Sequence, residues 1–108
     1  MKLWTKTTAR TMPAVYSQED VADPVVKLHY FDPCGAADWF IIEASAEDDD
    51  VVMFGLCDLG MGFPELGEVS LSDLQSGRGP LGLGIERDLY WSPRPLSAVR
   101  ADRAGSIY

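Results

Sequence analysis

Apolar and polar residues alternate after residue 24 in a way that predicts β-structure. In residues 25–31 (VVKLHYF), Val26, Leu28 and Tyr30 alternate with the other side chains. A period of two is expected of a strand with one face buried. This segment is therefore the first predicted strand, with these three residues on one face.

Two further runs have the composition of strands. Residues 39–45 (WFIIEAS) and 51–59 (VVMFGLCDL) are rich in aromatic and β-branched side chains, which strands favour. Pro33 and Gly35 interrupt the chain before the first run, and the acidic stretch at 47–50 (EDDD) separates the two. Connections this short join antiparallel neighbours, so the pattern predicts a meander.

The C-terminal half alternates between strand and helix signals. Residues 65–71 (ELGEVSL) predict a fourth strand and residues 85–91 (IERDLYW) a fifth. Between them, SLSDLQSG predicts a helix that ends at Gly77. Its N-cap is either Ser70, paired with Asp73, or Ser72, paired with Gln75. A short helix is expected from Leu96.

The 108 residues are expected to form one domain. Residues 1–24 carry weak signals, and we expect residues 1–11 and 100–108 to be frayed. The elements together predict a small α+β domain. Its antiparallel sheet has about four or five strands, and one or two short helices accompany it.

The composition is that of a globular protein rather than a disordered one, with 46% hydrophobic and 24% charged residues. Every apolar run is far shorter than the roughly 20 residues of a membrane-spanning helix. The basic N-terminus, MKLWTKTTAR, has no apolar stretch behind it and does not read as a secretory signal. We therefore expect a cytoplasmic protein without membrane association.

Cysteine and histidine are too scarce for most sites that use them. The single histidine, His29, and the absence of a CxxC pair argue against a zinc site. Cys34 and Cys57 would form one disulfide in an oxidising compartment. In the cytoplasm we expect two free thiols, with Cys57 buried in its strand. No GxSxG motif supports a hydrolase built on His29.

The net charge of −8 is unevenly distributed. Residues 11–76 carry −13, whereas residues 1–10 carry +3 and residues 77–108 carry +2. So acidic a middle segment repels phosphates, and direct binding of duplex DNA is not expected. The aromatic residues, including Phe63 and Tyr90, are assigned to the core or to one face of the sheet, because a stacking platform for single strands needs positive surroundings.

The acidic segment has two interpretations. It serves solubility alone, or it binds a protein partner that has a basic surface, such as a nucleic-acid-binding enzyme. The carboxylates expected on such a surface are Glu43, Glu47, Asp48, Asp49, Asp50, Asp58, Glu65 and Glu68.

A third interpretation of the carboxylates is catalytic. Glu86 and Asp88 lie two residues apart on the predicted fifth strand, and Glu65 or Glu68 would join them if the strands were neighbours. Converging carboxylates hold Mg²⁺ or Mn²⁺ in metal-dependent nucleases. An ion pair of Arg87 with a neighbouring acid is the simpler interpretation of ERD.

The stretch GRGPLGLG lacks the GK[ST] ending of a phosphate loop and is interpreted as a turn.

The ordered segments MPAVYSQEDVADPVVKLHYFDP, WFIIEAS, FGLCDLG and PELGEVSLSDLQSGRGPLGLGIERDLYW resemble a family of short bacterial proteins classed as a domain of unknown function. The resemblance spans about residues 12–99 and implies a setting on plasmids, phages and other mobile elements. Some relatives carry the label of single-stranded DNA endonuclease. The resemblance implies no catalytic residues.

Our leading hypothesis is a non-enzymatic acidic protein-interaction module without a cofactor. It would be an inhibitor of the DNA-mimic or anti-defence type, or an accessory, of a nucleic-acid-processing complex. The alternative is a nuclease for single-stranded DNA that uses Glu86, Asp88 and Glu65 or Glu68 with Mg²⁺ or Mn²⁺.

Overall fold

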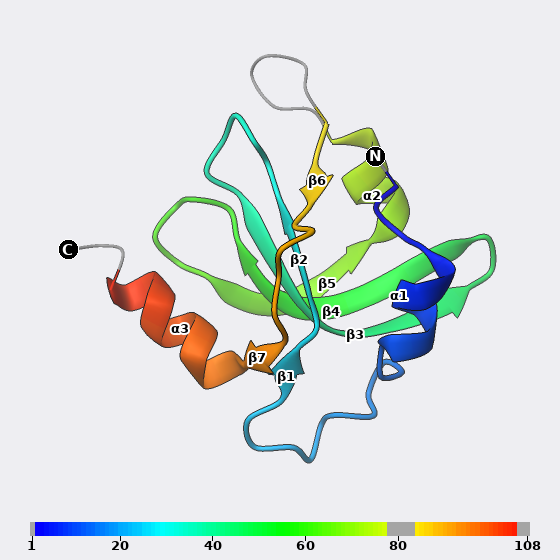
Figure 1. The fold of residues 1–108 in the computed structure, drawn as a ribbon, viewed down its shortest axis with the longest axis horizontal. Coiled ribbons are helices and arrows are strands. Elements are labelled where there is room, and N and C mark those ends of the chain that lie inside the picture. Colours follow the sequence, from blue (N-terminus) through cyan, green and yellow to red (C-terminus); the bar gives the residue numbers. More distant parts are fainter. Residues whose placement is uncertain (1, 78–83, 106–108) are drawn as a thin grey trace.

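The computed structural model describes residues 2–77 and 84–105, which form an α+β fold (Figure 1). The predicted fold class is therefore confirmed. The strands of the described part are β1 (Val25–Val26), β2 (Leu28–Phe31), β3 (Asp38–Glu47), β4 (Asp50–Asp58), β5 (Glu65–Ser70), β6 (Glu86–Arg87) and β7 (Arg94–Pro95). The helices there are α1 (Lys6–Thr11), α2 (Leu71–Ser76) and α3 (Leu96–Gly105).

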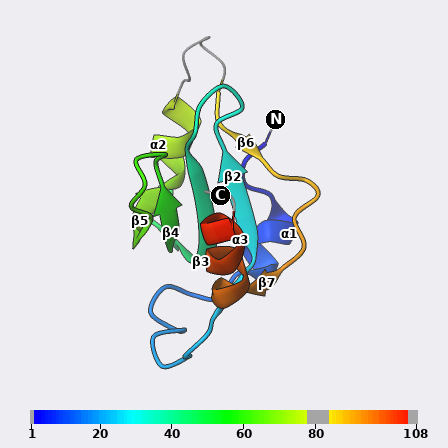
Figure 2. The same ribbon diagram turned by 90° about the vertical axis from the view of Figure 1, so that its left-hand side faces the viewer.

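The main sheet has five antiparallel strands in the order β5-β4-β3-β2-β6. Its strands β2 to β5 follow one another as a meander, as the short connections predict. β6 then returns to the free side of β2, so β5 and β6 form the two edges. Figure 2 shows β5 at the left-hand edge of the sheet. β1 and β7 pair in a separate two-stranded sheet.

The predicted first strand is divided at Lys27. β1 pairs with β7, whereas β2 pairs with β3 and β6, and the Lys27 N–H donates to the Ile41 carbonyl at 2.9 Å. Val26 consequently packs with α3, whereas Leu28 and Tyr30 pack on the opposite face of the main sheet. The prediction that these three residues share a face is wrong, because the change of partner strand rotates the chain between them.

Each face of the main sheet carries its own apolar cluster. One face packs against the N-terminal segment and α2 through Leu3, Met12, Tyr30, Ile41, Ala44, Val51, Met53 and Leu74. The other packs against α3 through Val26, Phe40, Ile42, Leu56, Leu96 and Val99. The sheet is thus covered on both sides. Figure 1 shows α3 on the left of the sheet and α1 and α2 on the right.

The N-terminal segment is part of the first cluster, although the sequence assigns it to a frayed end. The Thr5 side chain caps α1 by accepting from the Thr8 N–H at 3.2 Å. Leu3 is buried, and its carbonyl accepts a 2.6 Å hydrogen bond from the hydroxyl of Tyr30. Burial raises the pKa of Tyr30 to about 12. The structured start of the chain therefore depends on a contact with β2 that local sequence patterns do not report.

A β-bulge interrupts the pairing of β3 with β4. Ile41 pairs with Gly55 and Glu43 with Phe54, which leaves Ile42 as the extra residue. A bulge of this kind places two successive side chains on nearly the same face. Gly55 is required opposite it, because a Cβ there would lie 2.0 Å from the Phe40 carbonyl oxygen.

The helix signals are largely confirmed. Ser70 is the N-cap of α2 and accepts from the Asp73 N–H at 3.1 Å, and Gly77 ends the helix. α3 begins at Leu96, where the Asp23 carboxylate accepts from the Ser97 N–H at 2.9 Å and the Ser97 hydroxyl at 2.6 Å. Residues 100–105 continue this helix, and residues 106–108 lie outside the described residues.

The predicted fifth strand is reduced to β6. Asp88 ends the pairing because its Oδ1 accepts from the Tyr90 N–H at 2.9 Å, which forms a turn. Tyr90 is 93% exposed, and Phe63 in the β4–β5 connection is 82% exposed. The assignment of these two aromatic residues to the core or a sheet face is wrong. Tyr90 lies in this turn and Phe63 in a connection that leaves the sheet.

Candidate functional site

A charged cluster centred on His29 lies where α3 meets the main sheet. Nδ1 of His29 is 2.9 Å from Asp88 Oδ2, and Nε2 is 2.7 Å from Asp38 Oδ1. The three residues come from β2, the start of β3 and the turn after β6. Antiparallel pairing of β2 with both neighbours brings them together. The imidazole is 14% exposed.

The two carboxylates determine the protonation of His29. Burial by itself lowers the pKa of this histidine. Hydrogen bonds to Asp38 and Asp88 and the negative charges of these two residues raise the pKa by more than burial lowers it, so the net shift is upward. Asp88 responds in the opposite sense. Burial raises its pKa, whereas hydrogen bonds from His29 and Tyr90 lower it below the ordinary value. Each ring nitrogen of His29 thus faces a carboxylate oxygen, and both nitrogens donate hydrogen bonds when the imidazole is protonated.

Arg103 of α3 extends the cluster to β4. Its Nη1 is 3.3 Å from Asp38 Oδ2, and its Nε is 3.0 Å from Asp58 Oδ2. Asp58 is 6% exposed. Burial raises the pKa of Asp58, but the Gly60 N–H and the Arg103 guanidinium lower it more, and the net shift is downward. The chain of contacts from Asp88 to Asp58 therefore joins three strands, the turn after β6 and α3.

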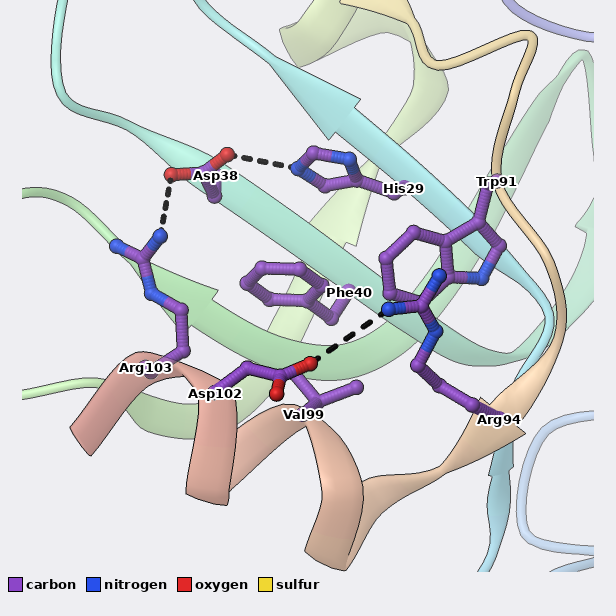
Figure 3. A pocket seen from close by; sticks show the side chains of 8 residues that line it. All are labelled: His29, Asp38, Phe40, Trp91, Arg94, Val99, Asp102 and Arg103. Atoms are coloured by element: carbon purple, nitrogen blue, oxygen red, sulfur yellow. Dashed lines mark hydrogen bonds and ion pairs between the residues drawn. The ribbon is translucent and has the colours of Figure 1, made fainter. Parts of the chain in front are cut away.

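A pocket of about 220 Å³ opens beside this cluster (Figure 3). His29 stacks on Phe40 with ring centres 4.7 Å apart and an angle of 5° between the rings. The Arg94 guanidinium lies 4.1 Å from the centre of the Trp91 ring and 3.6 Å from Asp102. Arg94 and Arg103, the two arginines that line the pocket, thus each face a carboxylate of the chain. Because both of these arginines pair with carboxylates of the chain, the lining is poorly suited to binding an external anion.

The acidic β3–β4 turn is exposed, in line with the sequence. Glu47, Asp48 and Asp49 are exposed, and Asp48 adopts a positive φ of 55°. Asp50 points towards α2 instead. Its Oδ2 accepts from the Ser72 hydroxyl at 2.6 Å and its Oδ1 from the Ser72 N–H at 3.1 Å. The turn is therefore fixed to the start of α2.

Two predicted surface carboxylates are buried, which corrects their assignment to an exposed acidic face. Glu43 is 4% exposed because the bulge turns it inward, and its Oε2 accepts from the Gln18 N–H at 2.7 Å. Asp58 is held inside by Arg103. Among the carboxylates expected on that face, those that remain exposed are Glu47, Asp48, Asp49, Glu65 and Glu68.

The four carboxylates of the nuclease alternative lie on different edges of the sheet. Glu65 and Glu68 belong to β5, whereas Glu86 belongs to β6 and Asp88 follows it. Three strands separate the two edges, so the structure does not bring the two pairs together. Asp88 instead contacts His29. Within residues 2–77 and 84–105, no group of three or more His, Cys, Asp or Glu side chains is arranged to hold a metal ion.

Other sequence features have simple outcomes. Cys34 and Cys57 are free thiols and are both half-buried, so Cys57 is less enclosed than expected. Burial raises the pKa of the Cys57 thiol.

Most of the glycine-rich stretch, residues 78–83, lies outside the described residues. No helix of the described part is long and apolar enough to span a membrane.

Local sequence patterns do not predict the His29 cluster. Asp38 and Asp88 have no motif spacing with His29, and Arg103 lies in a segment expected to fray. The useful signal was the order of the strands: a meander with a returning last strand places the ends of β2, β3 and β6 together. Periodicity does not show which strands pair with each other, so the strand order could not be predicted from the sequence.

A family model described as "Protein of unknown function (DUF2958)" matches residues 2–108, and the chain belongs to this family. The resemblance to a family without an assigned function is thereby confirmed. No curated protein and no solved structure matches the chain.

Proposed function

We propose that this member of the DUF2958 family is a non-enzymatic protein-interaction module whose partner presents a basic surface. The partner class is a nucleic-acid-processing enzyme, and the module acts as its inhibitor or accessory on a mobile element. One observation carries the proposal: exposed carboxylates lie on β5 and in the β3–β4 turn near its end, and exposed apolar side chains lie in the β4–β5 connection at its start.

The carboxylates of this surface lie at both ends of the edge. Glu65 and Glu68 are exposed on β5 itself. β5 leads into α2, and Asp50 ties α2 to the β3–β4 turn that carries Glu47, Asp48 and Asp49. Exposed carboxylates attract a positively charged channel at long range and raise the rate of association.

The apolar part of the surface comes from the β4–β5 connection. Met61 is 76% exposed, Phe63 82% and Leu59 58%. Exposed apolar side chains next to charged ones are typical of protein-docking surfaces, because the apolar contacts supply affinity and the charges supply orientation. β5 also has no strand on its outer side among the described residues, so its backbone groups are available to a partner.

The test compares capture of partners by three forms of the protein. The double variant Asp48→Asn, Asp49→Asn removes two charges from the surface. The control Asp49→Glu keeps the negative charge at an exposed position of the same turn. Capture from host extract is expected to fall for the first variant and not for the control. Affinity for the captured protein should drop steeply between about 50 and about 300 mM salt. Equal capture by all three forms would overturn the proposal.

The same preparation separates this proposal from the nuclease alternative. The wild-type protein is incubated with single-stranded DNA and Mg²⁺ or Mn²⁺, with and without chelator. The interaction module is expected to leave the DNA intact in both cases. Cleavage that requires the metal and disappears in Glu86→Gln or Asp88→Asn would establish the nuclease instead.

A further inference from the structure

A second pocket, of about 370 Å³, lies on the α3 face of the main sheet between the segment of residues 18–24 and strands β3 to β5. Its walls are mainly apolar and include Val21, Ile42, Phe54, Leu66 and Leu96. The described lining contains no lysine or arginine. Glu43 and Glu19 supply the charge, and both are acidic.

The β-bulge explains how a carboxylate reaches this apolar place. In a regular strand Glu43 would follow Ile41 onto the opposite face, where the first apolar cluster lies. The extra residue Ile42 shifts the register, so Glu43 pairs with Phe54, a pocket residue. Bulges redirect single side chains in this way and are common beside functional sites. Gly55 makes the bulge possible by leaving room for the Phe40 carbonyl.

Glu43 is a largely buried carboxylate that uses one of its two oxygens within the described residues. It is 4% exposed, and Oε2 accepts one hydrogen bond, from the Gln18 N–H at 2.7 Å. Within the part of the chain that the structure describes, no cation pairs with Glu43 and Oε1 accepts no hydrogen bond. Oε1 is not among the buried side-chain atoms of the described residues that lack a partner, so it stays accessible from the pocket. The pocket therefore offers an acceptor that the chain itself leaves unused.

We propose that this pocket receives a lysine side chain of the partner protein, with the ammonium group on Glu43. The four-carbon stem of lysine packs against apolar walls while its charge reaches an acid. Glu19 in the lining adds negative charge, and so does Glu68, which pairs across β4–β5 with Phe54 and lies on the same face. Because Oε2 is already engaged by Gln18, the single free oxygen suits an ammonium better than the two-pronged guanidinium of arginine.

This inference deepens the proposed function by naming a group that the acidic module recognises, and it rests on that function for the partner being a protein. Leu66 and Glu68 belong to β5, so the pocket adjoins the docking edge. A lysine on a basic partner surface would enter the pocket while neighbouring basic residues face the exposed carboxylates.

The experiment titrates the intact ¹⁵N-labelled protein with N-acetyl-lysine N-methylamide and follows amide shifts. Saturable shifts are expected at Gln18, Glu43 and Leu66. The norleucine analogue, which keeps most of the stem and lacks the charge, should bind at least about tenfold more weakly, as should the arginine analogue. Absence of saturable shifts at these positions would overturn the proposal. Equal or tighter binding of the arginine analogue would overturn the choice of lysine.

Two variants test the pocket itself. Glu43→Gln keeps an acceptor for the Gln18 N–H and removes the charge, so lysine binding should weaken at least about tenfold. Ala22→Trp fills the pocket from an exposed lining position and should abolish binding without touching the core. Circular dichroism checks that each variant is folded. Unchanged lysine binding in either folded variant would show that the shifts arise elsewhere.

The outcome is distinguishable from failure of the proposed function. The Asp48→Asn, Asp49→Asn variant should bind the lysine probe as the wild type does, because the turn does not line the pocket. Lysine binding without salt-dependent capture of a partner would count against the interaction module alone. Capture of a partner without lysine binding would count against the pocket alone.

Discussion

Arg103 Nε lies 3.0 Å from Asp58 Oδ2, and this contact attaches the C-terminal part of α3 to the end of β4. Asp58 is almost fully buried, whereas Arg103 remains about one-third exposed. The same guanidinium also reaches Asp38, which in turn contacts His29. One side chain of the helix therefore compensates two carboxylates of the sheet.

Replacement of Arg103 by alanine is expected to destabilise the protein by about 2 kcal/mol. The value is lower than for a fully buried pair, because the arginine is partly exposed, but Asp58 would be left buried and without its cation. Urea unfolding measures the change. Arg100→Ala, on an exposed position of the same helix, should shift stability by less than about 0.5 kcal/mol. Equal effects of the two variants would contradict the role of the contact.

Titration of His29 should lower the stability of the protein as the pH rises above 6.5. The pKa of folded His29 is raised above the unfolded value of 6.5 by Asp38 and Asp88, which outweigh its burial. Its contribution is therefore complete below pH 6.5 and is lost as the pH rises through the folded pKa. Because the chain has one histidine, NMR titration reports this pKa directly. The alkaline loss should be smaller in His29→Gln, and a folded pKa below 6.5 would refute the assignment.

Asp88 and Asp58 predict the opposite dependence in acid. Although burial raises their pKa values, hydrogen bonds lower them more, and the folded values lie below the ordinary 3.8. Their contribution is present above that pH and is lost as the pH falls through the folded pKa values. Unfolding curves between about pH 4 and pH 2 should show a smaller acid loss for Asp88→Asn than for the wild type. An identical acid loss would mean that Asp88 titrates normally.

Periodicity and capping rules predicted the elements whose signals are local. β3, β4 and β5 were found from runs of strand-forming residues, and α2 from the Ser70 cap and the Gly77 stop. These features need no knowledge of the rest of the chain. The divided strand at Lys27 and the helix α1 depend on distant partners, the strand β7 and Tyr30, and were missed.

The same distinction applies to the candidate sites. Exposure of the β3–β4 turn follows from four acidic residues in a hairpin connection and was predicted. Burial of Glu43 follows from a one-residue bulge, which periodicity treats as an ordinary alternation. Its assignment to the surface failed for that reason, and the pocket built around it could not be anticipated.

The N-cap of α2 should contribute measurably to stability. Ser70 accepts from the Asp73 N–H, and loss of this acceptor leaves a helix donor unsatisfied. Ser70→Ala is therefore expected to lower the free energy of unfolding by about 1 kcal/mol. Ser92→Ala is the matched control, because Ser92 is exposed and its side chain makes no hydrogen bond within the described residues. A stability loss in the control as large as in Ser70→Ala would point to a general effect of serine removal.

Gly55 should tolerate no side chain, because the bulge brings the Phe40 carbonyl oxygen to 2.0 Å from where a Cβ would lie. Backbone rather than a flexible side chain occupies this space, so Gly55→Ala would force β3 and β4 apart. The expected loss is about 3 kcal/mol in urea unfolding. Gly67 on β5 is the control, since no heavy atom lies within 4 Å of its virtual Cβ. Gly67→Ala should be neutral within about 0.5 kcal/mol or slightly stabilising, because alanine restricts the unfolded chain.

Lysine binding should also be weakened in Gly55→Ala at temperatures where this variant remains folded, because Glu43 depends on the bulge for its position. Normal stability of Gly55→Ala would mean that the strands are not paired in this register.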